Sequence, residues 1–114
     1  MSAQEPTSTI RTGAELVTVV NGFDVAAERQ RDLIVLLDRA TEDVMRHRPG
    51  FVFANIHRSL DGTRVANYAQ WESMEAFQAT MGDPAARSHV EATTEFATAS
   101  PGLYEVASVH CAPR

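Results

Sequence analysis

The sequence of 114 residues lacks several features that define common protein classes. It contains no lysine, so all ten basic side chains are arginines, and they face fifteen acidic ones. The net charge of -5 excludes the clustered positive surface that nucleic-acid-binding proteins require. The single cysteine, Cys111, cannot form an internal disulfide, which is typical of a reducing compartment. We therefore expect a cytoplasmic protein that binds no nucleic acid.

Long apolar runs and cofactor motifs are also missing. Residues 1–13, MSAQEPTSTIRTG, are small and polar, which predicts a flexible tail rather than a signal peptide. No apolar run approaches the length of a membrane span. The chain has no glycine-rich phosphate loop, and its four histidines have no metal-ligand spacing. These absences predict no membrane association and no metal site.

What remains is the pattern of one domain over residues 14–114, with 44% hydrophobic residues to form its core. The pattern predicts a strand over 14–23, a helix over 25–48 with Asp24 as its N-cap, hairpin strands over 51–59 and 64–71, helices over 72–81 and 84–99, and a last strand over 103–111. This β-α-β-β-α-β order, with its second helix split, indicates a ferredoxin-like α+β fold.

Local signals set the details of these elements. Asp61-Gly62 predicts a two-residue hairpin turn, which requires positive φ angles and places Val52 near Trp71 and Ile56 near Asn67. Helical spacing predicts two buried stripes. The first consists of Leu33, Leu37, Ala40 and Val44, and the second of Ala85, His89, Ala92 and Phe96. Asp83-Pro84 is expected to begin the last helix as its N-cap and first-turn proline, and Ser100-Pro101-Gly102 is expected to end it.

Alternation along the strand over 64–71 separates two sheet faces. Asn67 and Trp71, with Val65 and Ala69, are predicted to point toward the helices. The other face would carry Ala66, Tyr68, Gln70, Phe51, Phe53 and Asn55. Such a half-apolar face predicts a homodimer formed through the open side of the sheet.

The amide of Asn67 and the indole of Trp71 have two interpretations. Trp71 could be a large core residue, with Asn67 bonded to nearby backbone. Alternatively, both could line a pocket in which the indole stacks on a flat aromatic ligand and the amide binds its oxygen. Asn21, beside Gly22, could be a turn residue or a second polar group at the rim. His89 could be packed in the core or could carry protons near neutral pH. Met74, Phe77 and Met81 would line the core or the pocket.

The segment PGFVFANIHRSLDGTRVANYAQWESMEAF resembles the antibiotic biosynthesis monooxygenase family, and within it the actinomycete branch that oxidises polyketide anthrones to quinones. The resemblance implies a dimeric α+β barrel and a monooxygenase that uses O₂ without metal or flavin. It also implies that Asn67 and Trp71 hold and polarise the oxygen of a polycyclic aromatic substrate. Where some members have a tyrosine this chain has Phe77, and Arg87 is only an approximate counterpart of their helical arginine.

Together these observations predict Asn67, Trp71 and His89 as catalytic residues. The residues predicted to bind substrate are Asn21, Phe23, Phe77, Met81, Arg87 and Phe96. Haem degradation is one alternative, because Asn21 and His89 match positions in a haem-degrading branch, although the helical tryptophan of that branch is absent from AFQATM. A dimeric protein that binds a small molecule without reaction is the other alternative.

Overall fold

The computed structural model describes residues 5–13, 15–95 and 97–114. Its strands are β1 (Val17–Val25), β2 (Phe51–Arg58), β3 (Arg64–Trp71) and β4 (Ala97–Tyr104). Its α-helices are α1 (Gln30–Asp43), α2 (Met74–Met81) and α3 (Pro84–Thr93), with short 3-10 helices at Ala27–Arg29 and Met45–His47.

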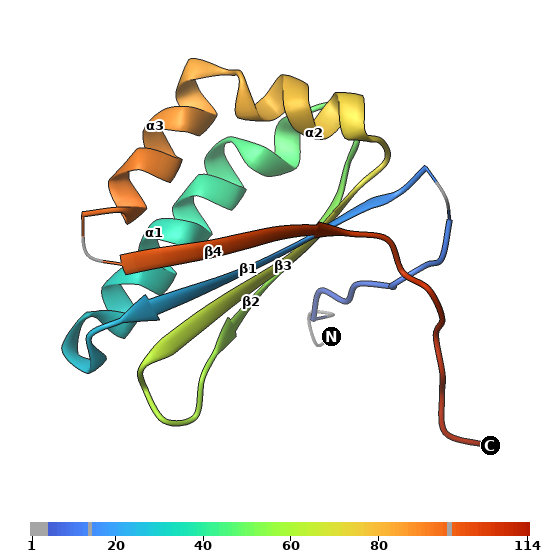
Figure 1. The fold of residues 1–114 in the computed structure, drawn as a ribbon, viewed down its shortest axis with the longest axis horizontal. Helices are drawn as coiled ribbons and strands as arrows, with labels where there is room; N and C mark the ends of the chain where they lie inside the picture. The colour runs from blue at the N-terminus through green and yellow to red at the C-terminus, as the bar shows by residue number, and fades with distance from the viewer. Residues whose placement is uncertain (1–4, 14, 96) are drawn as a thin grey trace, which may run out of the picture.

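The four strands form one antiparallel sheet in the order β2-β3-β1-β4. All three α-helices cover the same face of this sheet, and the other face is open (Figure 1). Side chains from β1, α1 and β3 form the core between the two layers: Phe23, Val25, Leu33, Leu37 and Val65. The ferredoxin-like α+β prediction is confirmed, and within one chain the sheet is open rather than closed into a barrel.

The prediction that Asp24 caps the first helix is wrong. Asp24 lies within β1, where it pairs with Arg64 of β3 both in register and through a 3.2 Å ion pair. The strand continues to Val25, whose N–H donates to the Thr63 carbonyl. A 3-10 turn then leads into α1, and the buried Gln30 at its start donates to the Arg64 carbonyl. Pairing with the hairpin therefore extends the strand beyond the expected boundary.

The hairpin connection is longer than the predicted two-residue turn. The Gly62 N–H donates to the Ser59 carbonyl, and Gly62 alone adopts a positive φ (83°) in this turn. The backbone N–H of Thr63, with the hydroxyls of Thr63 and Ser59, donates to the Asp61 carboxylate, which lowers the pKa of Asp61. The aspartate thus stabilises the turn through side-chain bonds rather than through a left-handed backbone.

A bulge at Val52 changes the predicted faces of β2. Ile56 does pair with Asn67, but Phe51 rather than Val52 pairs with Trp71, and Phe53 already pairs with Gln70. The extra residue reverses the alternation upstream of it. Phe51 therefore points toward the helices and not toward the open face, where Phe53 stacks on Tyr68.

The C-terminal third also differs from the prediction. Helix α3 ends at Thr93, and β4 runs through Ser100-Pro101-Gly102 instead of beginning after it. Proline is tolerated there because β4 is an edge strand, and an edge strand forms backbone hydrogen bonds along one side only. The predicted stripe of α3 is only partly correct: His89 and Ala92 are half-buried, whereas Ala85 is exposed, and the fully buried residues are Ala86 and Thr93. Phe96 lies outside the described residues.

The described part of the N-terminal segment, residues 5–13, contains no helix or strand and reaches the open face of the sheet. Ser8 donates to the Asn55 side chain, and the fully buried Gln70 donates to the Arg11 carbonyl and to Thr18. Within the described ranges, no helix has the length and apolar character to cross a membrane.

Candidate active site

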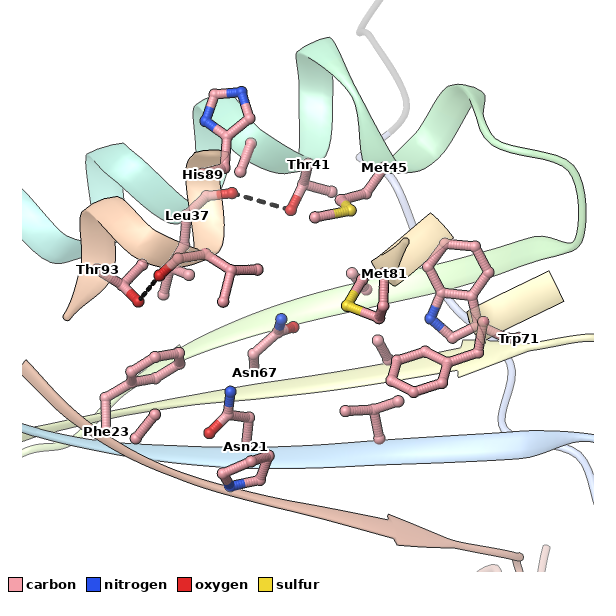
Figure 2. A pocket seen from close by; sticks show the side chains of 18 of the residues that line it. Asn21, Phe23, Leu37, Thr41, Met45, Asn67, Trp71, Met81, His89 and Thr93 are labelled. Carbon is pink, nitrogen blue, oxygen red and sulfur yellow. Dashed lines mark hydrogen bonds between the residues drawn. The ribbon is translucent and has the colours of Figure 1, made fainter. Parts of the chain in front are cut away.

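A cavity of about 310 Å³ lies between the sheet and the helices. Its floor consists of alternate residues of β1 and β3, together with Phe51 and Ala54 of β2. Its roof consists of residues from all three α-helices and of Met45 (Figure 2). The lining is mostly apolar, as expected for a small-molecule site in which a few polar groups set orientation.

Two amides provide the polar part of the floor. Asn21 of β1 and Asn67 of β3 are direct cross-strand partners, so their side chains lie next to each other on the helix-facing side. Both side-chain oxygens are buried, and within the described part of the chain neither has a hydrogen-bond partner. An unpaired buried polar atom costs about 1–3 kcal/mol. A pair of such atoms in one apolar cavity favours a ligand-binding role over a packing role.

Trp71 forms the end of the cavity, and two ring contacts hold its position. Its ring meets Phe51 edge-on at a centroid distance of 5.3 Å and Phe77 of α2 at 6.2 Å. The residue is 3% exposed, and its indole nitrogen points into the cavity (Figure 2). The indole N–H has no hydrogen-bond partner among the described residues, so it is available to a ligand as a donor.

The roof of the cavity carries hydroxyl groups and one imidazole. Thr41 of α1 donates to the Leu37 carbonyl at 2.9 Å, and Thr93 of α3 donates to the Val90 carbonyl at 2.7 Å. Each hydroxyl has used its single proton and can offer only lone pairs to a ligand. The half-buried His89 also lines the cavity, but its ring lies on the helix side, away from the two amides (Figure 2).

Helix α2 is held over the Trp71 end of the cavity at both of its ends. At its start, the Glu72 N–H donates to the Gly50 carbonyl, and a side chain at Gly50 would overlap the Cβ of Ala76. At its end, Asp83 accepts from the Arg48 guanidinium at 2.9 Å and also caps α3 through the Ala85 N–H. This predicted role of Asp83 as the N-cap of α3 is confirmed. Gly50 must be a glycine for two reasons: its φ is positive (85°), and α2 approaches it closely.

The structure brings most of the predicted site residues together. Those that line the cavity are Asn21, Phe23, Asn67, Trp71, Phe77, Met81 and His89. Arg87 is exposed on α3 and does not line it, since the helix begins too regularly to turn this side chain inward. Met74 is likewise outside it and 39% exposed. Phe96, which was predicted to bind substrate, lies outside the described residues, so its role stays a prediction.

Several lining residues were not predicted. Val19 could have been found from the sequence, because it lies two positions before Asn21 on the same strand face. Ala99 and Pro101 could not, because the strand that carries them was expected to be a helix and a turn. Within the described residues, no three His, Cys, Asp or Glu side chains are grouped as a metal site would require.

Comparison with known proteins identifies the family. The family model for antibiotic biosynthesis monooxygenase matches residues 16–92. Tetracenomycin-F1 monooxygenase of Streptomyces glaucescens is 43% identical over 99 residues, which cover 87% of this chain and 88% of the relative. The crystal structure of SnoaB, a cofactor-independent oxygenase from Streptomyces nogalater, matches with a TM-score of 0.75 and 27% identity over 84% of this chain and 97% of that one.

A more distant structure supports the fold alone. A protein from Shewanella oneidensis matches with a TM-score of 0.74 at 17% identity, over 84% of this chain and 95% of that chain. The family model extends from β1 to Ala92 of α3, so the two floor amides and Trp71 lie within the matched region. The chain belongs to the antibiotic biosynthesis monooxygenase family.

Proposed function

We propose that this monooxygenase oxidises a polycyclic aromatic intermediate of the anthrone or naphthol type to a quinone, using O₂ and neither metal nor flavin. The observation that carries the proposal is a pair of neighbouring amides, Asn21 and Asn67, on the floor of an otherwise apolar cavity beside Trp71. Their side-chain oxygens have no hydrogen-bond partner among the described residues. The names of two relatives, tetracenomycin-F1 monooxygenase and the cofactor-independent oxygenase SnoaB, support the substrate class and the absence of a cofactor.

The cavity suits such a substrate in shape and polarity. Trp71, Phe51 and Phe77 provide an aromatic end against which a flat ring can pack. The Asn67 amide and the Trp71 indole N–H are neutral donors that can stabilise a phenolate or enolate oxygen without being titrated themselves. The apolar lining would keep water away from the reactive anion.

The proposed reaction balances without a further reductant. The CH₂ group of an anthrone loses a proton, and the resulting carbanion transfers one electron to O₂. The substrate radical and superoxide combine and take up the proton, giving a hydroperoxide on the same carbon. Loss of water then forms the quinone carbonyl, so that one oxygen atom of O₂ enters the product and the other leaves as water. The role of the protein is to bind the substrate and favour its anion.

The test is oxygen consumption by protein treated with a chelator. With anthrone as substrate, we expect one O₂ consumed for each quinone formed, at a rate that added metal or flavin does not raise. Tight anthrone binding without oxygen consumption would contradict catalysis and support the non-catalytic alternative. A Soret band after addition of hemin, with no anthrone turnover, would support the haem-degrading alternative.

We also propose that two copies pair through the open face of the sheet, in the cytoplasm. Val20, Gly22, Ala66 and Tyr68 lie on this face and are only half-buried in the single chain. A stable interface buries about 800 Å² per partner, and a sheet face is an apolar surface of that kind.

Light scattering at micromolar concentration should therefore give twice the chain mass of 12.5 kDa. Ala66→Glu should give the monomer, because it would bury an unpaired charge in the interface. Ala85→Glu, on the exposed side of α3, is the matched control and should remain a dimer. A monomeric mass for the unmodified protein would contradict the proposal.

A further inference from the structure

The residues that line the cavity differ sharply from one another in solvent exposure. Most of the residues that line it are buried or half-buried, and four are exposed. Val90 and Thr94 come from the last turn and C-cap of α3, and Ala99 and Pro101 come from β4. Val90 is 45% exposed although it is apolar and lines a cavity. All four exposed residues thus lie on one side of the cavity, between α3 and the edge strand.

The other sides of the cavity are closed by contacts already described. At the Trp71 end, α2 is held against Gly50, and the Arg48–Asp83 ion pair holds the corner between α2 and α3. Along α1, Leu37 and Ala40 are buried against the sheet. Both β2 and β4 are edge strands of the sheet, but the lining residues of β2, Phe51 and Ala54, are half-buried, whereas Ala99 and Pro101 of β4 are exposed.

The register of the sheet places this exposed side next to the polar floor of the cavity. Pro101 of β4 pairs with Asn21 of β1, and Asn21 pairs with Asn67 of β3. A ligand that enters between α3 and β4 would therefore pass Asn21 before it reaches Asn67 and Trp71. Its leading ring would lie at the inner amide and the indole, and its trailing ring would remain between Val90 and the edge strand.

We propose that the opening between α3 and β4 is the entrance to the site, and that Val90 and Ala99 are specificity-determining residues that limit the width of the ring system passing between them. That the ligand is a flat aromatic rests on the proposed function. It follows that substituents on the trailing ring are tolerated, because they remain at the exposed end, whereas substituents on the leading ring must fit the closed end.

Rapid-mixing fluorescence without O₂ tests the entrance, because Trp71 is the single tryptophan and lies at the inner end. The probes are 1-naphthol, with two rings, and anthrone, with three. We expect Val90→Phe and Ala99→Phe each to slow anthrone association about tenfold and 1-naphthol association about twofold or less, because a narrower opening restricts binding in proportion to ligand width. Phenylalanine leaves Trp71 as the only indole that reports.

The matched control is Val35→Phe. Val35 is also a valine on a helix, is 42% exposed and does not line the cavity. Its association rates should equal those of the unmodified protein. Unchanged association rates in both entrance variants, or equal slowing in the control, would contradict the proposed entrance. Quenching in the unmodified protein without turnover in air would contradict the proposed function alone, whereas no quenching by either probe would overturn both.

Discussion

Asn67→Ala should lower kcat by about 10²-fold to 10³-fold, the usual loss when one donor to a developing oxyanion is removed. Its stability should not fall. The Asn67 side-chain oxygen is buried and has no partner in the described part of the chain, so removal of the amide eliminates an unfavourable contribution of about 1 kcal/mol or more to the folding free energy. The rate of quinone formation measures kcat, and thermal unfolding followed by circular dichroism measures stability.

Asn67→Asp sharpens this test, because it keeps the shape of the side chain and changes its charge. A carboxylate beside a phenolate would oppose formation of the substrate anion, so this variant should turn over more slowly than the alanine variant. If both variants retain the kcat of the unmodified protein, the amide does not act on the reacting oxygen.

Gln70→Ala is the matched control for the loss of a buried amide on the same strand. Gln70 points to the opposite face, and its amide nitrogen donates to Thr18 and to the Arg11 carbonyl. Here the unfolding free energy should fall by about 1 kcal/mol or less, because two hydrogen bonds of the amide nitrogen are removed together with a buried side-chain oxygen that has no partner among the described residues. The kcat should change by about twofold or less, since the side chain does not line the cavity.

Trp71→Phe should reduce kcat/KM by about 10-fold to 100-fold. The substitution removes the indole N–H that points into the cavity, a bond worth about 1.5–3 kcal/mol to a charged oxygen. It keeps an aromatic ring between Phe51 and Phe77, so the fold should persist with a loss of about 1–2 kcal/mol for the smaller volume. Initial rates of quinone formation over a range of substrate concentrations give kcat and KM separately.

Val65→Ala separates this effect from general destabilisation. Val65 is 1% exposed on the same face of the same strand, but it does not line the cavity. This variant should lose comparable stability and keep its kcat/KM. Equal activity losses in the two variants would show that Trp71 acts only through packing.

Local patterns were sufficient for the parts of the site that lie within one strand. Alternation along β3 is a property of the extended backbone, so the common face of Asn67 and Trp71 followed from their spacing. Helical spacing likewise predicted the buried Leu33, Leu37 and Ala40 of α1. The capping aspartate and proline that begin α3 were visible for the same reason, because capping depends on a few adjacent residues.

Features that depend on pairing between distant segments could not be read from such patterns. The bulge at Val52 moved Phe51 to the cavity side, since register is set by the partner strand. A proline such as Pro101 would interrupt a helix or a central strand, but it is compatible with an edge strand. Only the sheet order shows that β4 is an edge strand.

The sequence by itself therefore determined the family, the element order and the placement of an amide and an indole on one face of β3. Only the tertiary structure decided that Asn21 stands directly beside Asn67, that Arg87 lies outside the cavity, and that the exposed side of the cavity lies between α3 and β4. The physical reason is the range of the interactions. Backbone geometry fixes side-chain direction within a strand, whereas pairing and packing between distant segments fix which strands become neighbours.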